Sequence, residues 1–201
     1  MFFIKPPDVP IIKTERLILR GMRKQDADDI FKYCADPASS EYAVWYPHES
    51  ILETKTYIAW QAREIRRGGF MLWAIELKDG GQVIGTCSLS RDKDSAKIAE
   101  LGYGIRKEFQ NNGYASEAVS AALKYAFCEC GATRVFARVM AENEPSARLA
   151  KRVGMTLEGK LKKGIFCKGK SYDILLFAET DDEFLKKEKQ QAEEEQGATQ
   201  V

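Results

Sequence analysis

Alternating apolar and polar residues indicate where the chain forms strands. The alternation runs through 15–22 and then through three closely spaced segments at 70–77, 82–91 and 96–105. A half-buried strand turns every second side chain toward the core, which produces this period of two. The turn sequences KDGG and DKDS separate the last three segments, so we expect an antiparallel meander there.

Other segments repeat their apolar residues at helical spacing. The clearest is 115–131, where Val119, Leu123 and Phe127 recur every four residues and Gly131 follows as a stop signal. Pro37 is expected to end the first helix of the chain. The remaining helices are expected at 24–36, 51–69 and 142–154, with Gly68 and Gly69 closing the second of these.

The order of these elements predicts the fold class. A strand at 133–140 follows the helix at 115–131, and two more strands lie around the sequence CKGKS within 155–179. A strand, helix, strand unit implies a parallel pair inside an otherwise antiparallel sheet. We therefore expect an α/β (α+β) fold, with six to seven strands in a mixed, mostly antiparallel sheet and about four helices. Residues 1–180 are expected to form one domain, and 181–201 a charged tail that is partly helical or disordered.

Composition narrows the classes of function. The 201 residues include 31 basic and 30 acidic side chains, a net charge of +1, which argues against direct nucleic-acid binding through bulk positive charge. No apolar run is long enough for a membrane span. The five cysteines form no CxxC pair and the only histidine is His48, so we expect no metal site and a reduced, cytoplasmic setting.

One stretch combines polar residues and a glycine directly before a helix. It reads IRKEFQNNGYASEA and covers 105–118. The N–H groups at a helix N-terminus bind anions well, and Gly113 allows the backbone to approach a ligand closely. The stretch lacks both the Gly-Lys-Ser/Thr end of a P-loop and the glycine spacing of a Rossmann fold. Taken alone, it fits a plain loop as well as a phosphate cradle.

The motif from Gln110 to Ala115 resembles the acyl-CoA signature of the GNAT superfamily of N-acetyltransferases, Gln/Arg-x-x-Gly-x-Gly/Ala. The element order resembles that family over roughly 12–178. Further segments resemble the Rim-type branch of this family. The named members of that branch acetylate the N-terminal amine of ribosomal proteins. The segments are TERLILR (14–20), DP (36–37), WYPH (45–48), AELGYGI (99–105) and ENEPSARLAKRVGMTLEG (142–159). Many relatives act on other amines, so the resemblance leaves the acceptor open.

The resemblance implies acetyl-CoA as co-substrate, with its pantetheine arm between a splayed strand that ends near Arg106 and its neighbour at 133–140. The pyrophosphate would lie on N–H groups from Asn111 to Ser116. Arg106 then adds charge nearby or is simply a solvated loop cation. The implied cofactor-binding residues are Tyr103, Ile105, Arg106, Gln110, Asn111, Asn112, Gly113, Tyr114, Ala115, Ser116, Asn143 and Ser146.

The implied chemistry is direct attack of a neutral primary amine on the thioester in a ternary complex. Ser146 would protonate the leaving thiolate, and Asn143 would hold the cofactor arm, although Asn143 also suits a helix N-cap. Glu100 is the first candidate for the general base and Glu158 a weaker one; either is otherwise a surface charge. Ile165 occupies the position where the ribosomal-protein enzymes of this branch carry glutamate, which weakens the case for that substrate.

The first third of the family's chain forms the acceptor side, so Trp45 and His48 are candidate substrate-binding residues. Asp173 lines the same side or caps a turn. The acceptor is a protein N-terminus or a small molecule such as a polyamine or antibiotic. A non-catalytic acyl-CoA sensor is the rival class of function. The element order also leaves a homodimer open.

Overall fold

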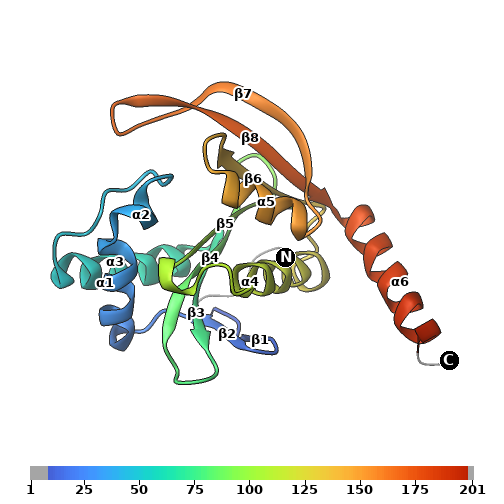
Figure 1. Cartoon of the computed structure of the whole chain (residues 1–201), viewed down its shortest axis with the longest axis horizontal. Coiled ribbons are helices and arrows are strands. Elements are labelled where there is room, and N and C mark those ends of the chain that lie inside the picture. Colours follow the sequence, from blue (N-terminus) through green and yellow to red (C-terminus); the bar gives the residue numbers. More distant parts are fainter. Residues whose placement is uncertain (1–8, 199–201) are drawn as a thin grey trace.

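The computed structural model describes residues 9–198, and in these residues a single mixed sheet of eight strands organises the fold (Figure 1). The strands are β1 (Ile12–Lys13), β2 (Leu17–Gly21), β3 (Phe70–Leu77), β4 (Val83–Arg91), β5 (Ile98–Ile105), β6 (Arg134–Met140), β7 (Thr156–Cys167) and β8 (Lys170–Thr180). Their spatial order is β1-β2-β3-β4-β5-β6-β8-β7. The mixed α/β class is confirmed. The strand that the pattern missed is β1, because two residues are too short to show alternation.

Every neighbouring pair of strands in this sheet is antiparallel except β5 and β6. The meander of β3, β4 and β5 is confirmed. The parallel pair is also confirmed, and α4 connects its two strands. A parallel connection needs a long crossover, and the α4 segment provides it.

The structure contains six α-helices within the described residues. They are α1 (Ala27–Ala35), α2 (Pro37–Ser40), α3 (Ile51–Arg67), α4 (Tyr114–Lys124), α5 (Glu144–Arg152) and α6 (Asp181–Ala198). Pro37 begins the single turn of α2 instead of only ending α1, since proline is tolerated at a first helical position. The C-terminal segment folds as one helix as far as Ala198. None of the helices in 9–198 is long and apolar enough to cross a membrane.

The helices cover the sheet in two layers with separate cores. The larger core includes Trp73 and Phe177 of the sheet with Val119 and Leu123 of α4, and it extends to α5 and α6. The smaller core packs Ile30 of α1 and α3 residues against β3 and β4 on the other face. Helices α4 and α5 therefore lie on one side of β5, and α1 and α3 on the other.

A buried charge network joins the sheet to the smaller layer. Arg20 on β2 is 5% exposed and Asp26, directly before α1, is 8% exposed. The Arg20 guanidinium donates to both Asp26 carboxylate oxygens at 2.7 and 2.8 Å and also contacts Glu76 on β3. Asp26 in addition accepts a hydrogen bond from the Arg23 N–H at 2.7 Å. This carboxylate therefore fixes where α1 begins relative to β2.

Replacing Asp26 tests that network. The variant Asp26→Ala leaves the buried Arg20 with only Glu76 as an anionic partner, and removing one member of a buried ion pair costs about 3 kcal/mol. We expect the free energy of unfolding in urea to fall by that amount. The control Glu64→Ala removes a more exposed pair with Arg67 and should change it by less than about 1 kcal/mol. Equal changes in the two variants would contradict the role given to Asp26.

Candidate active site

The parallel strands β5 and β6 separate soon after they meet. They pair only at Ile98, Ala99 and Glu100 of β5, although β5 continues to Ile105 and β6 continues to Met140. The Arg106 N–H donates to the Ile84 carbonyl on the β4 side, and hydrogen-bonding direction alternates along a strand. The main-chain groups of Leu101, Tyr103 and Ile105 therefore face the gap toward β6. This gap has the form expected for the pantetheine arm.

The loop after β5 leads directly into α4 and exposes backbone N–H groups. Asn111 and Gly113 have positive φ angles of 62° and 80°, and Gly113 is the N-cap of α4. The N–H groups of Tyr114, Ala115 and Ser116 lie in the first helical turn, which has no intrahelical acceptors. Over residues 9–198 no other protein acceptor is found for these three groups. We call the N–H groups of residues 114–116 the cradle.

Side chains hold this loop in place from two sides. The Gln110 amide donates to the Ile105 carbonyl at 3.0 Å, so its role in the structure is to tie the loop to β5. Arg16 lies on the other side and donates to the Asn112 carbonyl at 2.9 Å and to Glu117 at 2.7 Å. Its guanidinium also stacks over the Tyr114 ring, 4.6 Å from the centroid.

Arg16 is the cation that the structure brings to the cradle, and its position was not predicted from the sequence. It is separated from Gly113 by nearly the whole of the first half of the chain, and nothing local in TERLILR signals the contact. Hydrogen bonding to Glu117 raises the pKa of Arg16. Although partial burial opposes the shift, hydrogen bonds from Thr14 and Arg16 lower the pKa of Glu117, which keeps it ionised.

Arg106 has a different position from the one expected. It is only 6% exposed, and its guanidinium lies 3.7 Å from Asp29 of α1 and pairs with Glu108. It also stacks near Phe109, 5.1 Å from the ring centroid. These contacts direct the charge toward the α1 layer and away from the cradle. Arg106 is therefore left out of the phosphate site proposed below.

Tyr103 and Ser146 meet across the gap between β5 and α5. Their hydroxyl oxygens are 3.0 Å apart, and the Tyr103 hydroxyl is also 3.2 Å from the Ser146 carbonyl. Asn143 caps α5, since its side-chain oxygen accepts the Ser146 N–H at 3.1 Å. Burial raises the pKa of Tyr103, so its hydroxyl keeps its proton near neutral pH. The sequence proposed Ser146 for proton transfer and Tyr103 only for binding, but the fold makes them a pair.

Glu100 lies at the last paired position before the strands separate. Both of its carboxylate oxygens accept hydrogen bonds from Arg138 of β6, at 2.8 and 3.0 Å. The Glu100 side chain is 31% exposed and that of Arg138 is 49% exposed, so both remain accessible to an acceptor. Glu158, the weaker candidate, is held by Arg134, which lowers its pKa through their hydrogen bond.

The expected acceptor side contains a row of rings. Trp45 lies 5.9 Å from Tyr33 and 6.2 Å from His48, and His48 lies 5.6 Å from Tyr57, all between ring centroids. The His48 Nδ1 is 2.8 Å from the buried Thr54 hydroxyl. The structure thus places Trp45 and His48, the two candidate substrate-binding residues, next to each other. Tyr33 and Tyr57, which complete the row from α1 and α3, were missed because they occur within ordinary amphipathic helix patterns.

The row reaches β5 because Gly104 has no side chain. A Cβ at Gly104 would lie 2.0 Å from the Tyr33 hydroxyl oxygen. The hydroxyl therefore rests on the backbone of the same strand whose other edge faces the gap. Burial raises the pKa of Tyr33, so this group is a neutral hydroxyl beside the gap.

Asp173 is used elsewhere in the structure. Its carboxylate accepts the Lys163 N–H at 2.9 Å and pairs with Lys160 at 2.9 Å. These contacts stabilise an irregularity in β7 between Leu161 and Ile165. The hydrogen bond to Lys163 lowers the pKa of Asp173. This geometry matches the turn-capping alternative, so Asp173 is left out of the acceptor site proposed below.

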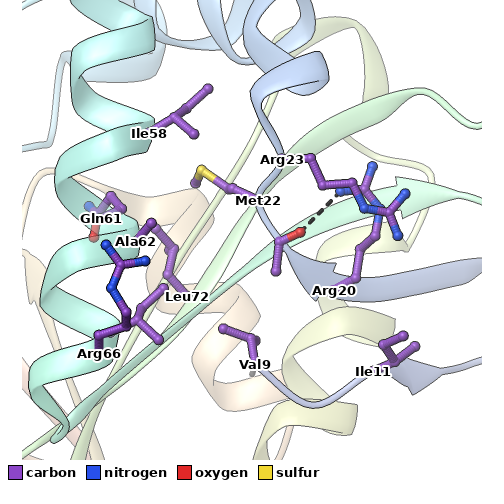
Figure 2. Close-up of a pocket in the computed structure, with 12 residues that line it drawn as sticks. Val9, Ile11, Arg20, Met22, Arg23, Ile58, Gln61, Ala62, Arg66 and Leu72 are labelled. Carbon is purple, nitrogen blue, oxygen red and sulfur yellow. Dashed lines mark hydrogen bonds between the residues drawn. The ribbon is translucent and has the colours of Figure 1, made fainter. Parts of the chain in front are cut away.

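A separate pocket of about 330 Å³ opens between α3 and the β2–β3 side of the sheet. Figure 2 shows Met22, Ile58 and Leu72 along it, with Arg23 and Arg66 at its border. Strand β4 lies between β3 and β5, so this pocket does not include the gap or the cradle. Within residues 9–198 no cluster of side chains suited to a metal ion is found.

Comparison with known proteins agrees with this geometry. The Acetyltransferase (GNAT) domain family matches residues 16–156. The chain is 33% identical over 169 residues to the uncharacterized N-acetyltransferase YoaA of Bacillus subtilis, covering 84% of this chain and 96% of YoaA. It is 28% identical to the [Ribosomal protein uS5]-alanine N-acetyltransferase of Escherichia coli, covering 86% of this chain and 93% of that protein.

A solved structure shares the same fold. RimL, a ribosomal L7/L12 alpha-N-protein acetyltransferase solved in complex with coenzyme A, superposes with a TM-score of 0.76. The match covers 85% of this chain and 98% of RimL, at 21% sequence identity. The family match over most of the chain, together with the YoaA relationship, shows that this chain belongs to the GNAT family of acetyltransferases.

Proposed function

We propose that this protein transfers the acetyl group of acetyl-CoA to the N-terminal α-amine of a polypeptide. The observation that carries the proposal is the separation of β5 and β6 beyond Glu100, which leads directly into the N–H cradle at the start of α4. An open strand edge is followed directly by an anion site. This arrangement matches acetyl-CoA, in which an extended pantetheine arm joins the thioester to the pyrophosphate. Related enzymes act on the α-amine of ribosomal proteins, which supports this type of acceptor.

The residues present fit acetyl-CoA in three places. The cradle of Tyr114, Ala115 and Ser116 would bind the pyrophosphate, with the loop Asn111, Asn112 and Gly113 leaving the approach open. The Arg16 guanidinium lies beside Gly113. A ligand phosphate and Glu117 would both bind this guanidinium. Main-chain groups of Tyr103 and Ile105 would bond the pantetheine amides. The Asn143 side-chain nitrogen has no partner among the described residues and would donate to the same arm.

Tyr103 and Ser146 would supply the proton that the leaving thiolate needs. Attack of the amine nitrogen on the carbonyl carbon forms the amide and breaks the carbon–sulfur bond, and the sulfur takes a proton. Tyr103 is partly buried and keeps its proton, and its hydroxyl oxygen lies 3.0 Å from that of Ser146. Either hydroxyl can donate its proton to sulfur and then receive a proton from the other hydroxyl. A thiol pKa of about 8.5 means that this help is modest.

Glu100 would accept the proton lost by the amine, directly or through one water molecule. It lies at the end of the paired part of β5, beside the position expected for the thioester. Both of its oxygens accept hydrogen bonds from Arg138, so an amine proton would have to share them with the guanidinium. An α-amine with a pKa of about 7.7 to 8.0 costs only about 1 kcal/mol to deprotonate at pH 7, whereas a lysine amine costs about 4 to 5 kcal/mol. The α-amine therefore needs much less help from Glu100 than a lysine amine does.

The acceptor would approach over the α1 and α3 layer. Tyr33 touches Gly104, and the rings of Trp45, His48 and Tyr57 continue the row from it. Such a row holds the first side chain of a polypeptide by apolar contact. Ile165, in place of the glutamate of the ribosomal-protein enzymes, leaves the identity of the polypeptide open.

The first experiment measures thiol release from acetyl-CoA with a panel of acceptors. We expect turnover with peptides that have a free N-terminus and at least about tenfold less with N-blocked peptides that contain lysine, because of the difference in amine pKa. Polyamines and aminoglycosides should resemble the lysine peptides. Turnover restricted to those small amines would contradict the polypeptide acceptor. Tight acetyl-CoA binding without thiol release for any amine would instead identify a sensor domain.

Gly113 is the test of the cradle. Gly113→Asp adds a Cβ and a negative charge at the proposed pyrophosphate site, and we expect the CoA dissociation constant from calorimetry to rise at least about tenfold, or 1.4 kcal/mol. Gly80→Asp is the matched control. Gly80 has a similar φ of 77° with no atom near its added Cβ, so it carries the same strain and charge. Equal CoA affinity in the two variants would remove the cradle from the proposal.

Tyr103 and Ser146 are tested together. We expect Tyr103→Phe and Ser146→Ala each to lower kcat about tenfold, while the CoA dissociation constant changes by less than about threefold. If the two hydroxyls act as one relay, the double variant should be little worse than either single variant. If the reductions in kcat of the two single variants multiply in the double variant, the two hydroxyls act independently. An unchanged kcat would exclude them from proton transfer.

A further inference from the structure

Glu117 places a carboxylate in the first turn of α4, close to the N–H cradle. It is the fourth residue of the helix, and its own N–H bonds the Gly113 carbonyl at 3.0 Å. A carboxylate near a helix start commonly turns back to accept the unpaired N–H groups there. A negative charge in this place would also repel a pyrophosphate bound on the cradle. Glu117 therefore opposes cofactor binding unless its carboxylate is used elsewhere.

The Glu117 carboxylate is used by the turn between β1 and β2. Its Oε1 accepts the Thr14 hydroxyl at 2.6 Å and the Arg16 N–H at 2.8 Å, and its Oε2 accepts the Arg16 Nε–H at 2.7 Å. The Thr14 hydroxyl also accepts the Leu17 N–H at 3.0 Å, which stabilises the turn. The Glu117 side chain is only 15% exposed. Its two oxygens therefore bond the turn and leave the cradle N–H groups to a ligand.

The same contacts fix the direction of the Arg16 guanidinium. Its Nε donates to Glu117, its Nη1 donates to the Asn112 carbonyl at 2.9 Å, and its central carbon lies over the Tyr114 ring. A guanidinium is planar, so fixing Nε and Nη1 also fixes Nη2. Among the described residues Nη2 has no acceptor, and it lies 3.2 Å from the position of a Cβ added to Gly113. Arg16 therefore presents available N–H groups one residue before the cradle begins.

Glu117 orders this cation before a ligand arrives. The Arg16 side chain is 44% exposed, and a long side chain at such a place has many rotamers when nothing holds it. Ordering it during binding would subtract free energy from the interaction with a phosphate. With Glu117 in place, the guanidinium already points beside Gly113. The carboxylate thus acts on a bound anion through Arg16, and its effect is opposite to that of its own charge.

We propose that Glu117 is a positioning residue for the cofactor, which holds Arg16 so that the Nη2 group binds the CoA pyrophosphate together with the N–H cradle. This inference rests on the proposed function and assigns a residue that acts through another. Glu117 itself touches no part of the ligand. The arrangement favours a thioester donor that carries a pyrophosphate over one that ends at pantetheine.

The variant Glu117→Gln separates positioning from plain electrostatics, because the two predict opposite signs. If Glu117 were only a nearby negative charge, its removal would tighten CoA binding. Because its loss releases Arg16, we expect the CoA dissociation constant from calorimetry to rise about fivefold to tenfold. Glu188→Gln is the matched control, since it removes one acidic charge and the ion pair with Lys124, which is also on α4. This control should bind CoA within about twofold of wild type. An unchanged or lower dissociation constant for Glu117→Gln, or an equal rise in both variants, would overturn the inference.

Arg16→Gln tests whether Glu117 acts through Arg16. We expect this variant to weaken CoA binding at least as much as Glu117→Gln does. In it the carboxylate has lost its cation and only repels phosphate, so adding Glu117→Gln should leave the affinity equal or raise it. If the two losses of affinity multiply instead, Glu117 acts independently of Arg16 and the inference is wrong. Wild-type affinity in Arg16→Gln would also overturn it.

A donor without phosphates distinguishes positioning from a loss of structure. S-acetylpantetheine has the same thioester and arm as acetyl-CoA but ends before the pyrophosphate. In Glu117→Gln we expect kcat/KM to fall about fivefold to tenfold for acetyl-CoA and to stay within about twofold for S-acetylpantetheine. Equal losses with both donors would show that Glu117 only stabilises the fold, which contradicts a positioning role.

The inference and the proposed function fail in different ways. If the wild-type protein acetylates no polypeptide, the proposed acceptor is wrong, and CoA calorimetry on the same variants still decides the role of Glu117. If acetylation proceeds and Glu117→Gln binds CoA as tightly as wild type, only the inference fails. A wild-type protein that does not bind CoA would overturn both.

Discussion

The site depends on a parallel strand pair that stays together for only three residues. Beyond Glu100 the β5 edge keeps its hydrogen-bonding groups but has no strand partner on the β6 side. Unpaired main-chain groups that are shielded from water are costly, so such an edge needs water or a ligand as its partner. The divergence therefore creates a linear binding surface. The loop that follows leads from this strand edge to the N–H cradle after Gly113. The strand edge and the anion site are therefore continuous along the chain.

At β5 the backbone is packed closely against β4 on one edge and against α1 on one face, because glycines occupy the contact positions. A Cβ at Gly85 would lie 2.1 Å from the Gly104 carbonyl, and one at Gly104 would lie 2.0 Å from the Tyr33 hydroxyl. Strands β4 and β5 therefore approach backbone to backbone here, and the Tyr33 side chain of α1 reaches the β5 backbone directly. As a result, the Tyr33 ring on one side and the Tyr103–Ser146 pair on the other lie on opposite faces of the same short segment of β5. The proposed acceptor and donor sides are separated by one strand.

Ion pairs set the charge pattern around the site. Arg106 is committed to Asp29 and Glu108, so it stabilises the α1 layer. Arg16 and Arg138, which are more exposed, each share their charge with one carboxylate on another element, Glu117 and Glu100. An exposed pair contributes little net stability, and its cation can exchange its partner for an anionic ligand. These two accessible pairs lie at the two proposed ligand sites, whereas the buried pairs of Arg20 and Arg106 hold the α1 layer on the sheet.

The sequence by itself determined the strand and helix order, the parallel pair, the loop at 110–115 and the N-cap at Asn143. These features depend on local periodicity, glycine conformation and capping, which neighbouring residues decide. It missed β1 and α2, which are too short for periodicity. Only the tertiary structure decided the partners of the charged and hydroxyl groups: Arg16 with the cradle, Arg106 with Asp29, Tyr103 with Ser146, and Asp173 with the bulge in β7. Such contacts join elements far apart in the chain, and a side chain's direction follows from packing that no local pattern contains.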